Sequence, residues 1–329
     1  MRPTFLVLLG LTLGATLPAA SVPTPLGPAD RSKLIRELAL PDLPATALAG
    51  VTVVRDLEFA RPADQPLRLD LYLPPAAATT RPVPCVLVIA GGGFAAQTRD
   101  RFGFVAAYLA AHGFAAASLD YRGAPEVRWL ETVRDTKAAV RWLRAHAADH
   151  GFDPARIAAL GQSAGGHLAA FLAATGDRPD FEPVAPAATP VASTRIQAAV
   201  ALAGVFDFVS RLRDGGQQSH QPKMLETKRR TNAAWIGEPF SPDLPVWRQA
   251  SPLTHVAPGT PPLLLLHCRG DATVPFAQSE QMAATLRPVS PRSRLVLYDG
   301  GGHNLIRAAG IAPRAWEEIV AFLRTELTR

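Results

Sequence analysis

The sequence predicts an α/β domain built on a mostly parallel central sheet of about eight strands, with helices on both faces. Short apolar runs alternate with helix-forming segments along most of the chain, which is the pattern of strand–helix–strand units. These runs are continuous, as expected for strands covered on both faces. The first two candidate strands, 51–59 and 67–73, instead alternate and are joined through residues 61–64, which predicts an antiparallel start to the sheet.

The composition is that of an ordinary globular protein, with 48% hydrophobic and 19% charged residues among 329. This excludes disordered and fibrous classes. The net charge is +6, but the arginines are scattered, so we predict a generally basic surface and no nucleic-acid partner. The dense cluster Lys223–Arg230 is interpreted as the solvated face of an excursion, with a polyanion site as the alternative.

Residues 1–20 have the pattern of a signal peptide. Arg2 precedes an apolar run, Phe5–Leu17, and small residues follow it. The run is short for a membrane span and no cysteine near its end offers a lipid site, so we expect a secreted or periplasmic protein without stable membrane insertion after signal removal. An uncleaved anchor is the alternative. Residues 21–50 read as a proline-rich N-terminal arm or linker, and the main domain covers 51–329.

The two cysteines, Cys85 and Cys268, are predicted to be free and buried. Cys85 opens one candidate parallel strand and Cys268 closes another. They should therefore lie at opposite ends of the sheet, beyond disulfide reach.

The remaining elements follow in order. After the first two strands, the further predicted strands are 85–90, 114–119, 157–160, 196–202, 263–267 and 294–298. The predicted helices are 101–112, 131–150, 167–174, 276–286 and 315–327. Residues 205–252 interrupt the alternation and are interpreted as an excursion above the sheet, with short helices at 223–230 and 233–236. Such an excursion would shape a substrate cleft.

Residues 161–165, GQSAG, match a G-x-S-x-G pattern between a buried strand and a helix. A strand that turns sharply into a helix strains the backbone at the apex, and small neighbours let the two elements pass closely. We therefore predict a nucleophile elbow with Ser163 at its tip. The alternative is a glycine-rich packing turn.

Two loops after later strands supply the partners that a serine nucleophile needs. Asp271 follows the strand 263–267 and His303 lies in a glycine-rich loop after the last strand. At parallel strand ends these loops should converge. A histidine can accept the serine proton, and a carboxylate on its other nitrogen fixes the tautomer. Asp299 is the rival acid, ranked behind Asp271.

Three other histidines are expected to have structural roles. His167 lies in the helix after the elbow, His255 follows Ser251-Pro252, and His267 ends a strand. We expect His267 to be packed or bonded to the backbone.

The glycine run at residues 91–93 follows a strand directly, so its amides can approach a ligand. We assign the amides of Gly92, Gly93 and Ala164 to an oxyanion hole. A phosphate-binding loop is excluded because the lysine and hydroxyl residue of that motif are missing. No Cys/His cluster suggests a metal, and no cofactor is predicted.

With these motifs the sequence resembles the alpha/beta-hydrolases, in particular carboxylesterases of the hormone-sensitive-lipase and bifunctional feruloyl and acetyl-xylan esterase type. The resembling segments are Ala90–Phe94, Leu119–Arg122, Lys137–Leu143, Gly161–Ala169, Ser251–Leu253 and the loops bearing Asp271 and His303. The sequence departs at Ala90, where the family usually has a histidine thought to brace the glycine loop. Arg269 also replaces a common acidic residue, which would alter the charge near Asp271.

The resemblance implies a serine carboxylesterase that hydrolyses small acyl esters. Together with the signal-like N-terminus, it leads us to expect an exported enzyme that acts on acetyl or feruloyl groups of plant polysaccharide. The alternatives are a serine peptidase or lipase-like hydrolase of the same fold, and a non-catalytic binding protein on it. Small-molecule or carbohydrate esters are the expected partners. The sequence does not predict an oligomeric state.

Overall fold

The computed structural model describes residues 22–40, 43–44, 46–75, 82–184, 192–213 and 222–328. Its strands are β1 (Thr24–Pro25), β2 (Thr52–Ala60), β3 (Leu67–Leu73), β4 (Val83–Ile89), β5 (Ala115–Leu119), β6 (Phe152–Gln162), β7 (Ala198–Leu202), β8 (Leu263–Cys268) and β9 (Arg294–Tyr298). Its helices are α1 (Pro28–Leu38), α2 (Gly103–Ala111), α3 (Trp129–Ala145), α4 (Ala164–Thr175), α5 (Phe208–Leu212), α6 (Pro222–Ile236), α7 (Pro245–Gln249), α8 (Ala277–Leu286) and α9 (Ala312–Leu327).

The strands form one nine-stranded sheet in the order β1-β2-β3-β5-β4-β6-β7-β8-β9. The pairs from β1 to β5 are antiparallel, and every pair from β5 through β4 to β9 is parallel. The predicted mostly parallel α/β fold is therefore confirmed, including the antiparallel start. The additional strand is β1, whose two residues pair with β2 and are too few to give a sequence signal.

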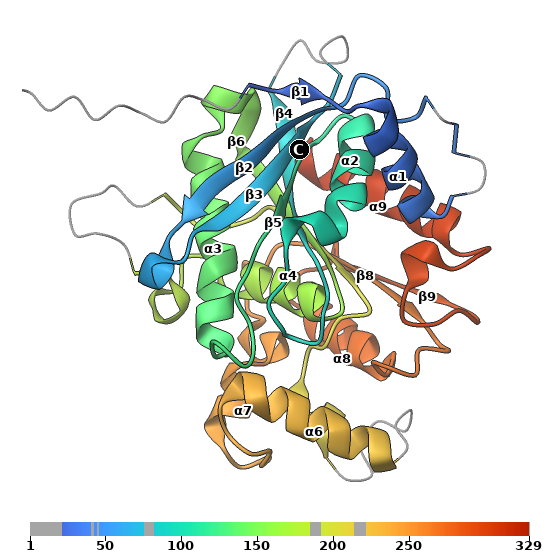
Figure 1. The fold of residues 1–329 in the computed structure, drawn as a ribbon. Coiled ribbons are helices and arrows are strands. Elements are labelled where there is room, and N and C mark those ends of the chain that lie inside the picture. The colour runs from blue at the N-terminus through green and yellow to red at the C-terminus, as the bar shows by residue number, and fades with distance from the viewer. Residues whose placement is uncertain are drawn as a thin grey trace, which may run out of the picture.

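Helices cover both faces of the sheet (Figure 1). One apolar core joins the sheet to α3, α4 and α8, and the other joins it to α1, α2 and α9. Successive residues of β4 alternate between them: Leu87 belongs to the first core and Val86 to the second. Burial on both faces explains why these strands read as continuous apolar runs.

The predicted end of α3 and the predicted start of β6 were each wrong by five residues. The helix ends at Ala145, short of the expected His150, and β6 begins at Phe152 rather than Ile157. A 3-10 turn, Ala148–His150, and the left-handed Gly151, with a φ of 72°, reverse the chain between them. The amide of Phe152 donates to the carbonyl of Ala147 at 3.1 Å, which starts the strand early.

The excursion contains one long helix where two short ones were predicted. Thr231 and Asn232 continue α6 without a break. Asn232 is buried, with its side-chain oxygen 3.5 Å from Nη1 of Arg211. A tertiary contact thus holds a residue of low helix propensity inside the helix. In Figure 1, α6 and α7 lie together at one end of the molecule.

The N-terminal arm packs against the main domain through Leu34 and Leu38, which are buried in the core shared with α2. Cys85 and Cys268 are both free and buried, as predicted. The proposed signal peptide, residues 1–20, lies outside the described residues. Within the described ranges, no helix is long and apolar enough to cross a membrane.

Candidate active site

Ser163 occupies a strained turn between β6 and α4. Its backbone has φ 57° and ψ −119°, a conformation that residues with a side chain rarely adopt. A Cβ at Gly161 would lie 2.1 Å from the carbonyl oxygen of Gly165, and one at Gly165 would lie 2.0 Å from that of Ile89. The flanking glycines are therefore required by close backbone approach, as the motif predicted.

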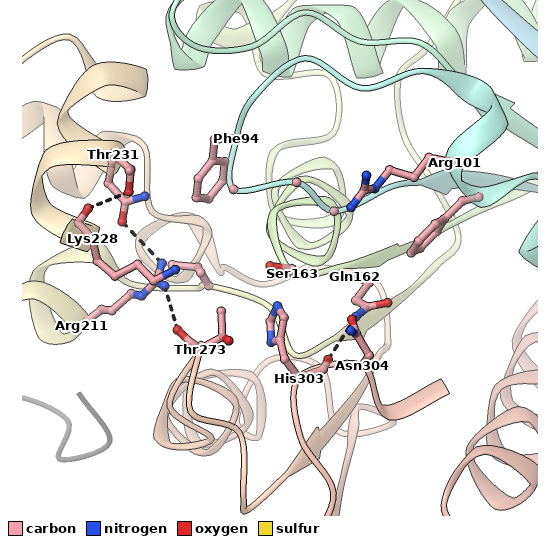
Figure 2. Close-up of a pocket in the computed structure, with 16 residues that line it drawn as sticks. Phe94, Arg101, Gln162, Ser163, Arg211, Lys228, Thr231, Thr273, His303 and Asn304 are labelled. Carbon is pink, nitrogen blue, oxygen red and sulfur yellow. Dashed lines mark hydrogen bonds between the residues drawn. The ribbon is translucent and has the colours of Figure 1, made fainter. Parts of the chain in front are cut away.

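His303 and Asp271 are brought together from the loops after β9 and β8. The Nδ1 atom of His303 lies 2.7 Å from Oδ2 of Asp271. Ser163 and His303 line the same cavity, and the imidazole ring faces the serine (Figure 2). The structure thus places the three sequence-predicted residues in the chain order and neighbourhood expected of a serine hydrolase.

The Asp271 carboxylate is buried and fully supplied with donors. Its side chain is 0% exposed. The amides of Thr273 and Val274 donate to Oδ1 at 2.7 and 3.0 Å, while Oδ2 faces both His303 and His267. Burial alone would raise the pKa of Asp271, but these hydrogen bonds outweigh it and hold the pKa well below its usual value. The group is therefore an anion at neutral pH.

His267 makes a contact that sequence reasoning missed. Its Nε2 lies 3.1 Å from Oδ2 of Asp271 and 3.0 Å from the carbonyl oxygen of Val274. Both are acceptors, so Nε2 carries the hydrogen, and the Ser279 hydroxyl at 2.7 Å can donate to Nδ1. The backbone bond was expected. The contact with Asp271 was not, and the only sequence signal for it is the spacing of four residues across the end of β8.

The rival acid, Asp299, points away from this cluster. Its side chain is 95% exposed and lies 3.3 Å from Nε of Arg269. The Arg269 guanidinium also sits over the ring of Phe276, at 5.2 Å from its centre. The expected effect of Arg269 on the charge near Asp271 is therefore reduced, because Asp299 is its ion-pair partner.

His167 and His255 have structural surroundings. His167 is wholly buried, and burial lowers its pKa to about 3, so it is neutral and Nδ1 donates to the carbonyl of Val205 at 2.8 Å. His255 packs edge-on against Phe171, with ring centres 5.1 Å apart. Its Nε2 lies 2.7 Å from the carbonyl oxygen of Gln249.

The glycine loop after β4 lies directly against the elbow. A Cβ at Gly91 would come within 3.0 Å of the Ser163 Cβ. For the amides of Gly92, Gly93 and Ala164, no acceptor is recorded within the described ranges. Amides left open beside a serine can hold a negatively charged oxygen.

Ala90, which stands where the resembling family usually has histidine, is buried behind that loop. Its carbonyl oxygen accepts a hydrogen bond from the Tyr121 hydroxyl at 2.7 Å. This hydrogen bond fixes the backbone at the start of the glycine loop.

Gln162, the residue before the serine, ties the elbow to the histidine loop. Its Nε2 donates to the carbonyl of His303 at 3.0 Å and to Oδ1 of Asn304 at 2.8 Å (Figure 2). These two bonds fix the backbone that carries the imidazole. The pattern G-x-S-x-G leaves this position free, so the motif alone did not indicate the role.

The cavity beside Ser163 has a volume of about 320 Å³. It is lined by Gly91, Gly92, Gly93, Phe94, Arg101, Phe102, Gln162, Ser163, Val205, Arg211, Lys228, Thr231, Asn232, Thr273, His303 and Asn304. The excursion contributes one wall, through α5 and α6. Lys228, from the run interpreted as a solvated face, lines this wall, whereas Arg230 is exposed. No group of three or more candidate metal ligands occurs among the described residues.

Comparison with known proteins places this chain in a family. The family model described as BD-FAE matches residues 69–286, which run from within β3 to the end of α8. The chain belongs to the BD-FAE family. The predicted resemblance to alpha/beta-hydrolase carboxylesterases is thereby confirmed.

Among curated proteins, the BD-FAE chain is similar to the probable carboxylic ester hydrolase LipM of Mycobacterium tuberculosis. The two are 34% identical over 223 residues, which cover 68% of this chain and 49% of LipM. Esterase LipC of the same organism is 31% identical, with coverage of 72% and 57%. The chain thus spans about half the length of the curated relatives it matches.

Among solved structures, the BD-FAE chain is similar to a thermophilic esterase from Thermogutta terrifontis, Est2, in a propionate-bound form. The TM-score is 0.64 at 27% identity, covering 85% of this chain and 94% of Est2. An acetyl ester-xyloside bifunctional hydrolase from Caldicellulosiruptor lactoaceticus gives a TM-score of 0.67 at 23% identity, covering 82% and 95%. The second likeness concerns the fold alone.

Proposed function

We propose that this protein is a serine carboxylesterase that hydrolyses small acyl esters through an acyl-enzyme on Ser163. The observation that carries the proposal is the 2.7 Å contact between His303 and Asp271, with Ser163 and His303 facing one cavity. Membership of the BD-FAE family and the likeness to esterases support it. The propionate-bound form of Est2 supports a short acyl group.

The proposed reaction follows from proton transfers at the imidazole. With Nδ1 of His303 donating to Asp271, Nε2 is free to take the proton of the Ser163 hydroxyl as its oxygen attacks the ester carbonyl. The amides of Gly92, Gly93 and Ala164 hold the oxyanion. The imidazolium then returns the proton to the departing alcohol, leaving an ester on Ser163.

The second half repeats the steps with water. His303 takes a proton from a water molecule, which attacks the acyl-enzyme and forms a second oxyanion. Collapse of this intermediate releases the carboxylic acid, and the proton returns to Ser163. The chemistry requires no cofactor.

As a finer proposal, the natural substrates are acetyl or feruloyl esters of plant polysaccharide outside the cytoplasm. The support is the signal-like pattern of residues 1–20, which points to secretion or the periplasm. Acetylated xylan and methyl feruloate, assayed beside a peptide amide, test this substrate class. Release of acetate or ferulate without amide cleavage is the expected result.

The mechanism is tested by Ser163→Ala with 4-nitrophenyl acetate as substrate. Loss of the nucleophile should lower kcat on the order of 10⁶-fold, and a fluorophosphonate probe should no longer label the protein. Ser241→Ala, in the loop before α7, is the matched control and should retain both activity and labelling. Full activity of Ser163→Ala would refute the proposal.

A further inference from the structure

The cavity beside Ser163 carries an excess of positive charge. Three of its lining side chains are cationic, namely Arg101, Arg211 and Lys228. The described residues that line it include no aspartate or glutamate. The nearby carboxylate of Asp271 is hidden behind His303, with its side chain 0% exposed. An ester with only neutral groups would offer these cations no opposite charge.

Arg211, from α5, is a built part of the cavity wall. The residue is 4% exposed. Its Nη2 donates to the carbonyl of Thr273 at 3.2 Å and its Nη1 lies 3.5 Å from Oδ1 of Asn232. Both recorded partners are neutral oxygens, and within the described part of the chain the buried Nε has no hydrogen-bond partner. Burial lowers its pKa to about 10, so Arg211 is charged at neutral pH.

Lys228 approaches the same place from α6. It lies one helical turn before Asn232, the partner of Arg211, and so on the same side of the helix. In Figure 2 the side chains of Lys228 and Arg211 run beside one another towards the cavity that holds Ser163. Burial, together with the charge of Arg211, lowers the pKa of Lys228. Two like charges at close range in a half-buried site destabilise each other unless an anion compensates them.

The negative charge of Asp271 does not neutralise both Arg211 and Lys228. Arg211 alone would balance its single charge, and the carboxylate is already held by two imidazoles and two amides. Among the residues that the structure describes, Lys228 is then a surplus cation beside the reaction centre. An ordinary solvated lysine would not be half-buried on the wall of a cavity, as Lys228 is.

We propose that Arg211 and Lys228 form a subsite for a carboxylate on the substrate, so that the enzyme prefers esters with a negative charge near the scissile bond. This inference rests on the proposed esterase function. The planar guanidinium and the ammonium are the usual donors to carboxylates, and the cavity between them and Ser163 holds the ester. A uronic acid on an acylated sugar and a monoester of a dicarboxylic acid both have this chemistry.

Two matched pairs of substrates test the proposal and locate the charge. 4-Acetoxybenzoate against 4-acetoxybenzamide places the carboxylate in the alcohol part. Phenyl hydrogen adipate against the phenyl ester of adipic monoamide places it in the acyl part. In at least one pair, the charged ester should have the higher kcat/KM by roughly 10- to 100-fold, the range for one hydrogen bond to a charged group.

Variants at Lys228 assign the preference to the subsite. Lys228→Gln should reduce the ratio of the two kcat/KM values about tenfold, and Lys228→Glu should reverse it in favour of the neutral ester. Arg230→Gln removes an exposed charge two positions along the same helix and should leave the ratio unchanged. Melting temperatures of all variants establish that each is folded.

The outcomes separate this inference from the function on which it rests. If Ser163-dependent hydrolysis occurs with equal kcat/KM within both pairs, the carboxylate subsite is refuted while the esterase function stands. A preference that survives Lys228→Glu also refutes it. If none of the four esters, nor 4-nitrophenyl acetate, is hydrolysed, the proposed function falls together with the subsite.

Discussion

Two buried cations of this protein, Lys137 and Arg211, differ in the charge of their partners. The Lys137 side chain is 0% exposed and its Nζ lies 2.8 Å from a carboxylate oxygen of Glu182. It also donates to the carbonyls of Thr175 and Gly176, and so ties α3 to the end of α4. Arg211 is nearly as buried, but its recorded partners are neutral oxygens.

The difference distinguishes a cation that holds the fold from one that awaits a ligand. Both side chains lose hydration on burial, a large cost unless it is offset by an opposite charge or well-placed acceptors. At Lys137 the chain supplies them itself. At Arg211 it does so in part, beside a cavity and a second cation. Incompletely compensated charge that faces a cleft is typical of binding sites.

Of the substitutions that test this comparison, one at Lys137 is expected to have the largest effect on stability. Lys137→Met should lower the free energy of unfolding by about 3 kcal/mol, because it leaves Glu182 half-paired and several acceptors without a donor. Glu182 keeps its ion pair with Arg141, at 2.6 Å, which limits the loss. Urea denaturation measures the change. The kcat/KM of the folded variant should match that of the wild type, and a loss below about 1 kcal/mol would contradict a structural role.

A smaller stability change and a larger kinetic one are expected at Arg211. Arg211→Met should lower the free energy of unfolding by about 1 to 2 kcal/mol, since only two neutral oxygens lose a donor. The preference for the charged esters should be abolished. Urea denaturation measures the change in stability, and the kcat/KM ratios of the two substrate pairs measure the preference. If the preference persisted, Arg211 would be a structural cation like Lys137 and the distinction would fail.

The smallest effect is expected at the exposed pair of Arg269 and Asp299. Arg269→Gln should change the free energy of unfolding by no more than about 0.5 kcal/mol, because both side chains are solvated. The kcat for 4-nitrophenyl acetate should also stay within about twofold of the wild type. A larger fall in kcat would mean that the charge of Arg269 acts on Asp271 despite its partner.

Much of the fold and the candidate site could be predicted because their signals are local in the sequence. Strands buried on both faces give continuous apolar runs, and parallel strands deliver their following loops to one edge of the sheet. Asp271 and His303 could therefore be paired although they are 32 residues apart in the chain. In the structure, His303 Nδ1 and Asp271 Oδ2 lie 2.7 Å apart. The elbow at Ser163 carries its own steric requirement for glycine.

What could not be predicted depends on contacts between distant segments. Lys228 was read as part of a solvated face because a charged run gives no sign of which residue turns inward. Arg211 has no motif, and its burial becomes visible only when α6 is placed over α5. His267 was expected to bond the backbone, but its contact with Asp271 depends on how the loop after β8 folds back.

The wall that carries Arg211 and Lys228 is inserted between two strands that are already neighbours. Leu202 ends β7, and the chain re-enters the sheet at Leu263, which begins β8 and pairs with Ala199. The intervening segment therefore leaves at the carboxyl ends of the strands and returns to the opposite edge of the sheet beside β7. Because β7 and β8 pair directly with each other, the segment itself contributes no strand to the sheet. The same segment supplies Trp235, whose ring stacks on Phe94 of the glycine loop at 4.1 Å. Changes confined to its charged side chains can therefore alter selectivity, whereas replacing its apolar side chains would disturb the reaction centre itself.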